Sequence, residues 1–284
     1  MEQPVISGLD SFILGIVEGI TEYLPISSTG HLVVTSKILG LSEDASRTAD
    51  QIAAIQAFEI VIQAGAILAV LFLYKKAIID LIAGVFGKSE HGRKVFINIC
   101  FAVFPVLIVG FLLKDAVKNL QFTAPVLIAT VVGGLAMILF ERFYARRPDI
   151  MDKPHVGMHE LTPKQAIFIG CCQCLALWPG TSRSMVTIMS GMFTGLKRPI
   201  AAEFSFLVGL PVLLLATAYK GMKSGRLLID HIGPSALLIG LVTSAVFAFF
   251  AVKWLVSFLN KRGLELFGWY RLAFALVIYF VVGL

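Results

Sequence analysis

The sequence predicts an all-α polytopic membrane protein, with six transmembrane helices and two re-entrant helix-loop-helix hairpins in an inverted-topology repeat. Three observations carry this prediction: a high hydropathy, two hydrophobic runs that are each interrupted halfway, and a similarity between the two halves of the chain. The 284 residues are 57% hydrophobic and 15% charged, with a mean hydropathy of +0.86. Soluble domains carry a larger charged fraction, so we expect a single integral membrane domain over residues 1–284.

The charges and cysteines narrow the class further. The net charge of +6 comes from Lys and Arg residues that cluster between the hydrophobic runs, which is typical of cytoplasmic loops and does not indicate a nucleic-acid partner. The first residues lack the features of a removable signal peptide. Cys171, Cys172 and Cys174 lie together in an apolar run, where a role as small hydrophobic residues is favoured over a disulfide or a zinc site.

Six hydrophobic runs are long enough, or nearly so, to cross a hydrocarbon core at about 1.5 Å per residue. They cover residues 57–74, 95–113, 123–140, 203–219, 234–256 and 268–284.

Two further runs, residues 9–41 and 164–196, are interrupted at 25–30 and at 179–184 by proline, glycine and hydroxyl residues. Each break leaves two pieces that are too short to span. Non-helical backbone at membrane depth persists only inside protein or along a polar cavity. We therefore expect two re-entrant hairpins with internal tips.

The two halves, residues 9–142 and 164–284, resemble each other. A shift of 155 positions places Gly15 on Gly170, Glu18 on Gln173, Ser27 on Ser182 and Thr29 on Ser184, and a shift of 144 places Glu59 on Glu203 and Gly65 on Gly209. Each half holds one hairpin and three spans, so the second half enters the membrane with the opposite orientation. Such inverted repeats bind their ligands near the midplane, where discontinuous helices meet.

The loop charges predict the orientation. If the connection between residues 75 and 94 is cytoplasmic, that side also receives Arg142, Arg146, Arg147, Lys153, Lys164, Lys197, Arg198, Lys261 and Arg262. The outer side then receives Lys114, Lys118, Lys220, Lys223 and Arg226. Both termini are expected outside, with the first hairpin entering from the outer face and the second from the cytoplasm.

Acidic residues at membrane depth indicate function, because each costs a few kcal/mol at the least. Glu18 and Glu22 are four residues apart and share one helical face, so their carboxylates suit a shared cation or proton. The alternative is a polar seam that pairs with Arg or Lys of another helix. Glu59 and Glu203 begin their predicted spans, where a helix-dipole role competes with site lining.

The first break supplies hydroxyls and free backbone N–H groups at a helix start, in Ser27, Ser28 and Thr29. This arrangement suits an anion, although such hydroxyls also serve as simple helix caps. His31 follows Ser28 at i+3 and is expected to exchange a proton with it.

The second break carries Ser182, Arg183 and Ser184 in the corresponding position. A guanidinium binds phosphate or carboxylate oxygens in pairs, and the alternative is a buried ion pair with Glu18 or Glu22. Hydroxyls, acids, a histidine and an arginine together favour a phosphate site. Arg271 and Lys253, in the last two spans, are expected to snorkel toward the span ends.

The motifs Glu18-Gly-x-Thr-Glu22-x-Leu-Pro-x-Ser-Ser-Thr-Gly-His31 and Pro179-Gly-x-Ser182-Arg183-Ser184 resemble those of the bacterial undecaprenyl-diphosphatase (bacitracin-resistance protein) family. The resemblance covers essentially the whole chain. It implies hydrolysis of undecaprenyl diphosphate to undecaprenyl phosphate and phosphate, which recycles the lipid carrier of peptidoglycan synthesis and confers bacitracin resistance. It also implies a divalent cation, Mg²⁺ or Ca²⁺, and a multi-pass protein of the bacterial cytoplasmic (inner) membrane whose site faces the outer, periplasmic side.

The residues suggest roles in that activity. Our hypothesis is that Ser28 attacks the terminal phosphorus, with His31 as the alternative nucleophile. His31 then takes the Ser28 proton or assists water in the second step, with Glu22 as the alternative base. The phosphoryl oxygens are held by Ser27, Thr29, Ser182, Arg183 and Ser184. Glu18 and Glu22 hold the cation.

One competing function is a lipid-carrier flippase or secondary transporter, because inverted repeats with broken helices are common in transporters. A candidate nucleophile and base in one motif favour the enzyme. The sequence leaves the oligomeric state open.

Overall fold

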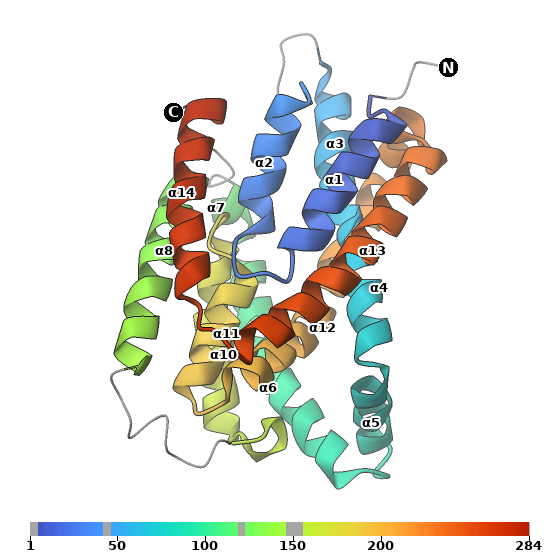
Figure 1. The fold of residues 1–284 in the computed structure, drawn as a ribbon. Helices are drawn as coiled ribbons and strands as arrows, with labels where there is room; N and C mark the ends of the chain where they lie inside the picture. The colour runs from blue at the N-terminus through green and yellow to red at the C-terminus, as the bar shows by residue number, and fades with distance from the viewer. Residues whose placement is uncertain (1–4, 42–46, 119–122, 146–155, 284) are drawn as a thin grey trace.

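The computed structural model describes residues 5–41, 47–118, 123–145 and 156–283. Within these residues every regular element is helical (Figure 1). The elements are α1 (Gly8–Thr21), α2 (Ser28–Ile38), α3 (Ala49–Val61), α4 (Gln63–Leu73), α5 (Lys75–Val85), α6 (Glu90–Leu112), α7 (Lys114–Lys118), α8 (Thr123–Ala145), η1 (Met158–Glu160), α10 (Pro163–Gln173), η2 (Cys174–Leu177), α11 (Arg183–Phe193), α12 (Arg198–Leu227), η3 (Leu228–Ile232), α13 (Pro234–Leu259) and α14 (Glu265–Val282).

The six predicted spans are confirmed. In the described residues six helical stretches are long and apolar enough to cross a membrane: Ala49–Leu73, Glu90–Leu112, Thr123–Tyr144, Arg198–Ile232, Pro234–Leu259 and Glu265–Val282. Several of these helices begin earlier than the hydrophobic runs, because one or more turns with polar residues precede the apolar part of each helix. Three of the basic loop residues used to predict the orientation, Arg146, Arg147 and Lys153, lie outside the described residues.

The earlier helix starts correct the expectation for the two acids near the span starts. Glu59 lies close to the end of α3, and Glu203 lies beyond the first turn of α12. A helix dipole acts within the first turn, so neither carboxylate serves there. Glu59 accepts a 2.6 Å hydrogen bond from the Ser36 hydroxyl instead.

Local sequence explains where the short helices begin. Ser7 and Thr162 form capping boxes that start α1 and α10, in which each side chain accepts from the third helical residue and that residue's side chain bonds back. α1 has 14 residues, and α2, α10 and α11 have 11 each. At about 1.5 Å per residue none of the four crosses a membrane alone.

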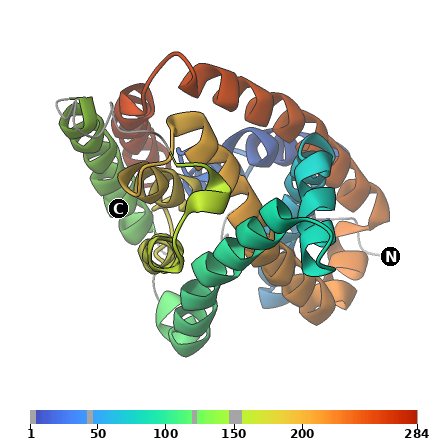
Figure 2. The same ribbon diagram turned by 90° about the horizontal axis from the view of Figure 1, so that it is seen from below.

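The two halves pack on each other in a matched way. α1 packs along α13 of the second half, and α10 packs along α6 of the first. α6 and α13 lie on opposite sides of the molecule (Figure 2). A Cβ on Gly15 of α1 would lie 2.8 Å from the Gly240 carbonyl oxygen, and one on Gly170 of α10 would lie 2.5 Å from that of Ala102. The repeat-related glycines thus permit the same close helix contact in both halves.

The remaining spans complete the bundle. α14 packs on α8, and α12 packs on α3 and α4. The described parts of both ends of the chain lie at one end of the molecule, with α5 at the other (Figure 1). The α1–α2 loop and the segment before α11 both lie deep between these ends, and this places two hydroxyl-rich loops in the interior.

Candidate active site

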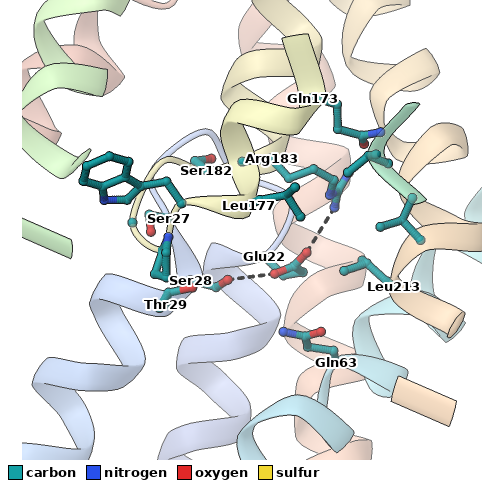
Figure 3. Close-up of a pocket in the computed structure, with 16 residues that line it drawn as sticks. Glu22, Ser27, Ser28, Thr29, Gln63, Gln173, Leu177, Ser182, Arg183 and Leu213 are labelled. Atoms are coloured by element: carbon teal, nitrogen blue, oxygen red, sulfur yellow. Dashed lines mark hydrogen bonds and ion pairs between the residues drawn. The ribbon is translucent and has the colours of Figure 1, made fainter. Parts of the chain in front are cut away.

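The two loops predicted to meet do so inside the bundle (Figure 3). The Arg183 Nη2 atom donates a 3.0 Å hydrogen bond to Oε1 of Glu22, across the two repeats. The Ser184 hydroxyl donates a 2.8 Å bond to the carbonyl oxygen of Leu24. Both contacts join the α1–α2 loop to the start of α11, so the site is assembled from both halves of the chain.

Ser27 and Ser182 adopt the same unusual backbone conformation. Their φ and ψ angles are 75° and 100° for Ser27 and 74° and 107° for Ser182, and among the described residues no other non-glycine has a positive φ. Each side chain caps its helix, accepting from the N–H of Gly30 and of Met185 respectively. Such conformations cost about 1–3 kcal/mol and occur mostly at functional sites.

Glu22 bonds to both the Ser28 hydroxyl and the Arg183 guanidinium. It follows directly after α1, and its side chain is 7% exposed. Its Oε2 atom accepts a 2.7 Å hydrogen bond from the Ser28 hydroxyl, while Oε1 accepts from Arg183. A serine that donates to a buried carboxylate has a base in place to take its proton.

Arg183 is held from three sides. Besides the Glu22 bond, its Nη1 donates a 3.0 Å bond to the Ser205 carbonyl oxygen, and its guanidinium lies 5.4 Å from the Tyr23 ring centre. A Cβ at position 209 would collide with the guanidinium, so Gly209 of α12 makes room for it. The Nε atom is buried and has no protein partner. The guanidinium is therefore fixed in place, and its buried Nε–H donor is left unused.

A cavity of about 190 Å³ opens beside these residues. Drug-sized ligands occupy pockets of about 300–1,000 Å³, so this one suits a head group rather than a long lipid. Its polar lining comprises Glu22, Ser27, Ser28, Thr29, Gln63, Gln173, Ser182 and Arg183. Ser184 does not line the cavity: its side chain is fully buried and ties the two loops together.

Both ring nitrogens of His31 bond to groups other than Ser28. Its Nδ1 lies 2.7 Å from the Ser27 carbonyl oxygen, an acceptor only, so Nδ1 carries the proton. Its Nε2 then accepts from the Tyr270 hydroxyl at 2.7 Å. The ring stacks on Phe274 with centroids 3.8 Å apart. Both ring nitrogens are occupied, and the expected proton exchange with Ser28 is replaced in this structure by the Ser28–Glu22 bond.

Glu18 lies one turn before Glu22 and is fully buried. Neither of its carboxylate oxygens has a hydrogen-bond partner in the protein. An isolated carboxylate in such surroundings is unfavourable unless a proton or cation accompanies it. Among the described residues no group of three or more His, Cys, Asp or Glu converges, so any cation here would draw further oxygens from hydroxyls or from a ligand.

Comparison with known proteins identifies the family. The model of the family "Bacitracin resistance protein BacA" matches residues 11–277. The chain belongs to this family. It is 40% identical over 281 residues to undecaprenyl-diphosphatase 3 of Acinetobacter baylyi, covering 98% of each protein. It is 40% identical to the undecaprenyl-diphosphatase of Sorangium cellulosum, covering 93% of this chain and 83% of that one. It is 39% identical to undecaprenyl-diphosphatase 1 of Burkholderia ambifaria, covering 95% and 94%.

In this BacA family protein, sequence reasoning missed several residues around the site. Gln63 lines the cavity from the start of α4. The sequence feature that could have indicated it is a polar side chain within an apolar run. Gln173 lines it too, as the repeat mate of Glu18. Tyr270 gave no signal, because its contact with His31 joins residues 239 apart in the chain.

Proposed function

We propose that this protein hydrolyses undecaprenyl diphosphate to undecaprenyl phosphate and phosphate, with Ser28 as the nucleophile. The relatives named undecaprenyl-diphosphatase, at about 40% identity over nearly the whole chain, support the substrate. The 2.7 Å hydrogen bond from Ser28 to Glu22, beside Arg183, carries the assignment of the reaction. The nucleophile Ser28, the base Glu22 and the guanidinium of Arg183 then line one cavity that suits a diphosphate head.

The reaction takes two steps. The Ser28 oxygen forms a bond to the terminal phosphorus as the bridging P–O bond breaks, and undecaprenyl phosphate leaves. Glu22 takes the hydroxyl proton in this step. Water then attacks the phosphorus of the phosphoserine as its bond to the Ser28 oxygen breaks. Glu22 returns its proton to that oxygen and takes one from the water, and this proton is released with the phosphate. Because the Ser28 hydroxyl bonds to the Glu22 carboxylate, we assign Glu22 as the base. His31 bonds the Ser27 carbonyl oxygen, so we assign it the role of positioning the loop around Ser27.

Arg183 stabilises the phosphoryl oxygens. A guanidinium is permanently charged and matches two phosphate oxygens at once. The Ser182 and Thr29 hydroxyls and the backbone around Ser27 face the same cavity and donate to the remaining oxygens. The Arg183–Glu22 pair keeps both charges satisfied until the substrate enters.

We further propose that Glu18 and Glu22 hold a divalent cation, Mg²⁺ or Ca²⁺, together with substrate oxygens. Two carboxylates plus phosphate oxygens are a usual ligand set for Mg²⁺. The two unpartnered oxygens of the buried Glu18 support this assignment. When bound, the cation would neutralise charge on the diphosphate.

The protein is a multi-pass membrane protein, and we propose that the α1–α2 and α10–α11 segments are re-entrant hairpins whose site opens to the periplasmic side. All four helices are too short to span, and their loops are internal. The basic loop residues favour a cytoplasmic position for the α4–α6 connection. The isoprenoid tail then remains in lipid while the head enters the cavity.

Phosphate release from undecaprenyl diphosphate by the purified protein in detergent tests the activity. We expect release that requires both Ser28 and Arg183. An active Ser28→Ala variant would overturn the nucleophile, and a wild-type protein without activity would overturn the enzyme. The transporter alternative has no support from the relatives, and transport alone does not require the Ser28–Glu22 bond.

A further inference from the structure

Arg271 is a fully buried arginine on α14 that lines no part of the cavity. The prediction that Arg271 snorkels to a span end is wrong, because its side chain turns into the bundle. The guanidinium donates four hydrogen bonds to carbonyl oxygens: Nε to Thr130 at 3.2 Å, Nη1 to Thr181 at 3.0 Å, and Nη2 to Ala129 and Gly180, each at 2.8 Å.

These four bonds join two elements that are distant in the sequence. Ala129 and Thr130 belong to α8, whereas Gly180 and Thr181 directly precede Ser182 and Arg183. A buried charge costs several kcal/mol unless its donors are satisfied. In the described part of the chain every hydrogen-bond partner of Arg271 is a backbone carbonyl. Because these partners are carbonyl oxygens, Arg271 holds the backbone of the segment that precedes α11.

Small residues allow the loop and the arginine to approach α8 closely. Gly180 has a φ of +93°, and a Cβ on it would lie 2.6 Å from the Val126 carbonyl oxygen of α8. A Cβ on Gly133 of α8 would collide with the Arg271 guanidinium. The loop and the guanidinium therefore approach α8 so closely that neither glycine has room for a side chain.

The same helix also holds the first loop. Tyr270 donates to His31, Phe274 stacks on the His31 ring, and His31 in turn bonds the Ser27 carbonyl oxygen. Consecutive residues 270 and 271 thus reach the two loops whose serines share the same backbone conformation.

We propose that Arg271 is a positioning residue of the phosphatase: by fixing the Gly180 and Thr181 carbonyls to α8, it places Ser182 and Arg183 at the phosphoryl group without touching the substrate. This inference rests on the proposed function. A guanidinium is required because it offers five N–H donors in one rigid plane, whereas a lysine ammonium offers three from a single atom.

The test compares Arg271→Lys with wild type in phosphate release, after the folded fraction of each has been measured by size-exclusion chromatography in detergent. We expect kcat per folded molecule to fall about 10- to 100-fold, as for a misplaced catalytic group. Arg142→Met is the matched control, because Arg142 pairs with Glu265 across the same α8–α14 contact but at the exposed end. This variant should retain wild-type kcat and KM.

A double-mutant cycle with Ser182→Ala separates positioning from simple stabilisation. If Arg271 acts through the loop, Arg271→Lys should cause a much smaller further loss when Ser182 is already absent. An unchanged kcat per folded molecule in Arg271→Lys, losses that multiply fully in the double variant, or an Arg271→Lys protein that cannot be recovered folded would each overturn the proposal. An inactive wild-type protein would instead overturn the proposed function.

Discussion

Ser28 and Glu22 lie six residues apart on either side of a helix break, and the Ser28 hydroxyl donates a 2.7 Å hydrogen bond to Oε2 of the Glu22 carboxylate. The break makes this contact, because Ser28 begins α2 after a turn of the backbone at Ser27, whose φ is positive. An uninterrupted helix would separate residues six apart by about 9 Å along its axis. The turn therefore brings the proposed nucleophile to the proposed base.

Replacing Ser28 by alanine should remove phosphate release entirely, because no other hydroxyl bonds to Glu22 among the described contacts. The matched control is Ser36→Ala, also on α2, which removes a similar 2.6 Å bond to a buried glutamate, Glu59, outside the cavity. Activity is measured as phosphate released from undecaprenyl diphosphate. Retained activity in Ser28→Ala would assign the nucleophile to another group.

Glu22→Gln should lower kcat by about 10²- to 10⁴-fold, the usual contribution of a general base. The amide keeps the shape of the carboxyl group but accepts no proton at neutral pH, and it leaves Arg183 without its charge partner. Glu59→Gln serves as the control carboxylate. If His31→Gln proved far more damaging to kcat than Glu22→Gln, the base would be His31 and the bonds seen here would belong to a resting state.

Arg183→Lys should reduce kcat/KM by about 10²-fold or more, because an ammonium does not reproduce the paired contact with phosphate oxygens. Arg198→Lys is a close control. Arg198 also pairs with a buried glutamate, Glu141, and lies 5.1 Å from a tyrosine ring centre, but it does not line the site cavity. Similar kinetic losses in both variants would indicate a general effect of removing arginine.

Removal of divalent cations with EDTA should abolish phosphate release, and Mg²⁺ or Ca²⁺ should restore it. Glu18→Gln is expected to raise the cation concentration needed for half-maximal activity, because it removes one charged ligand. The measurement is a titration of activity against free metal in wild type, Glu18→Gln and the control Glu59→Gln. Full activity in EDTA would contradict the cation proposal and leave the serine mechanism intact.

Gly170→Ala should lower stability by about 1–3 kcal/mol, the usual cost of overpacking. The added methyl would lie 2.5 Å from the Ala102 carbonyl oxygen, where α10 meets α6. Gly225→Ala in α12 is the control, since nothing lies within 4 Å of its added Cβ, and alanine there should be neutral or stabilising. Thermal unfolding in detergent measures both, and equal Tm values would contradict the close helix contact.

The sequence alone predicts the six spans, the two interrupted hydrophobic runs and the correspondence of Ser27 with Ser182. Hydropathy fixes which segments enter a membrane because exposed polar backbone is excluded there. A shift of 155 positions relates the two serine-rich breaks and indicates a repeat. The φ and ψ angles of Ser27 and Ser182 agree within 7°. The inverted repeat also placed Glu22 and Arg183 at one predicted site, because it brings the two breaks together. The sequence left open whether Arg183 pairs with Glu18 or Glu22, and the structure pairs it with Glu22.

The hydrogen-bond partners of the buried side chains depend on how the helices pack, and the sequence pattern does not report them. His31 follows Ser28 at helical spacing, yet its ring bonds Tyr270, and Arg271 turns inward to four carbonyl oxygens instead of reaching the membrane surface. Both outcomes depend on α14 packing against α8 and α2, which are both distant from it in the sequence. Periodicity and spacing report local geometry, whereas side-chain partners across helices depend on how the packed bundle places those helices.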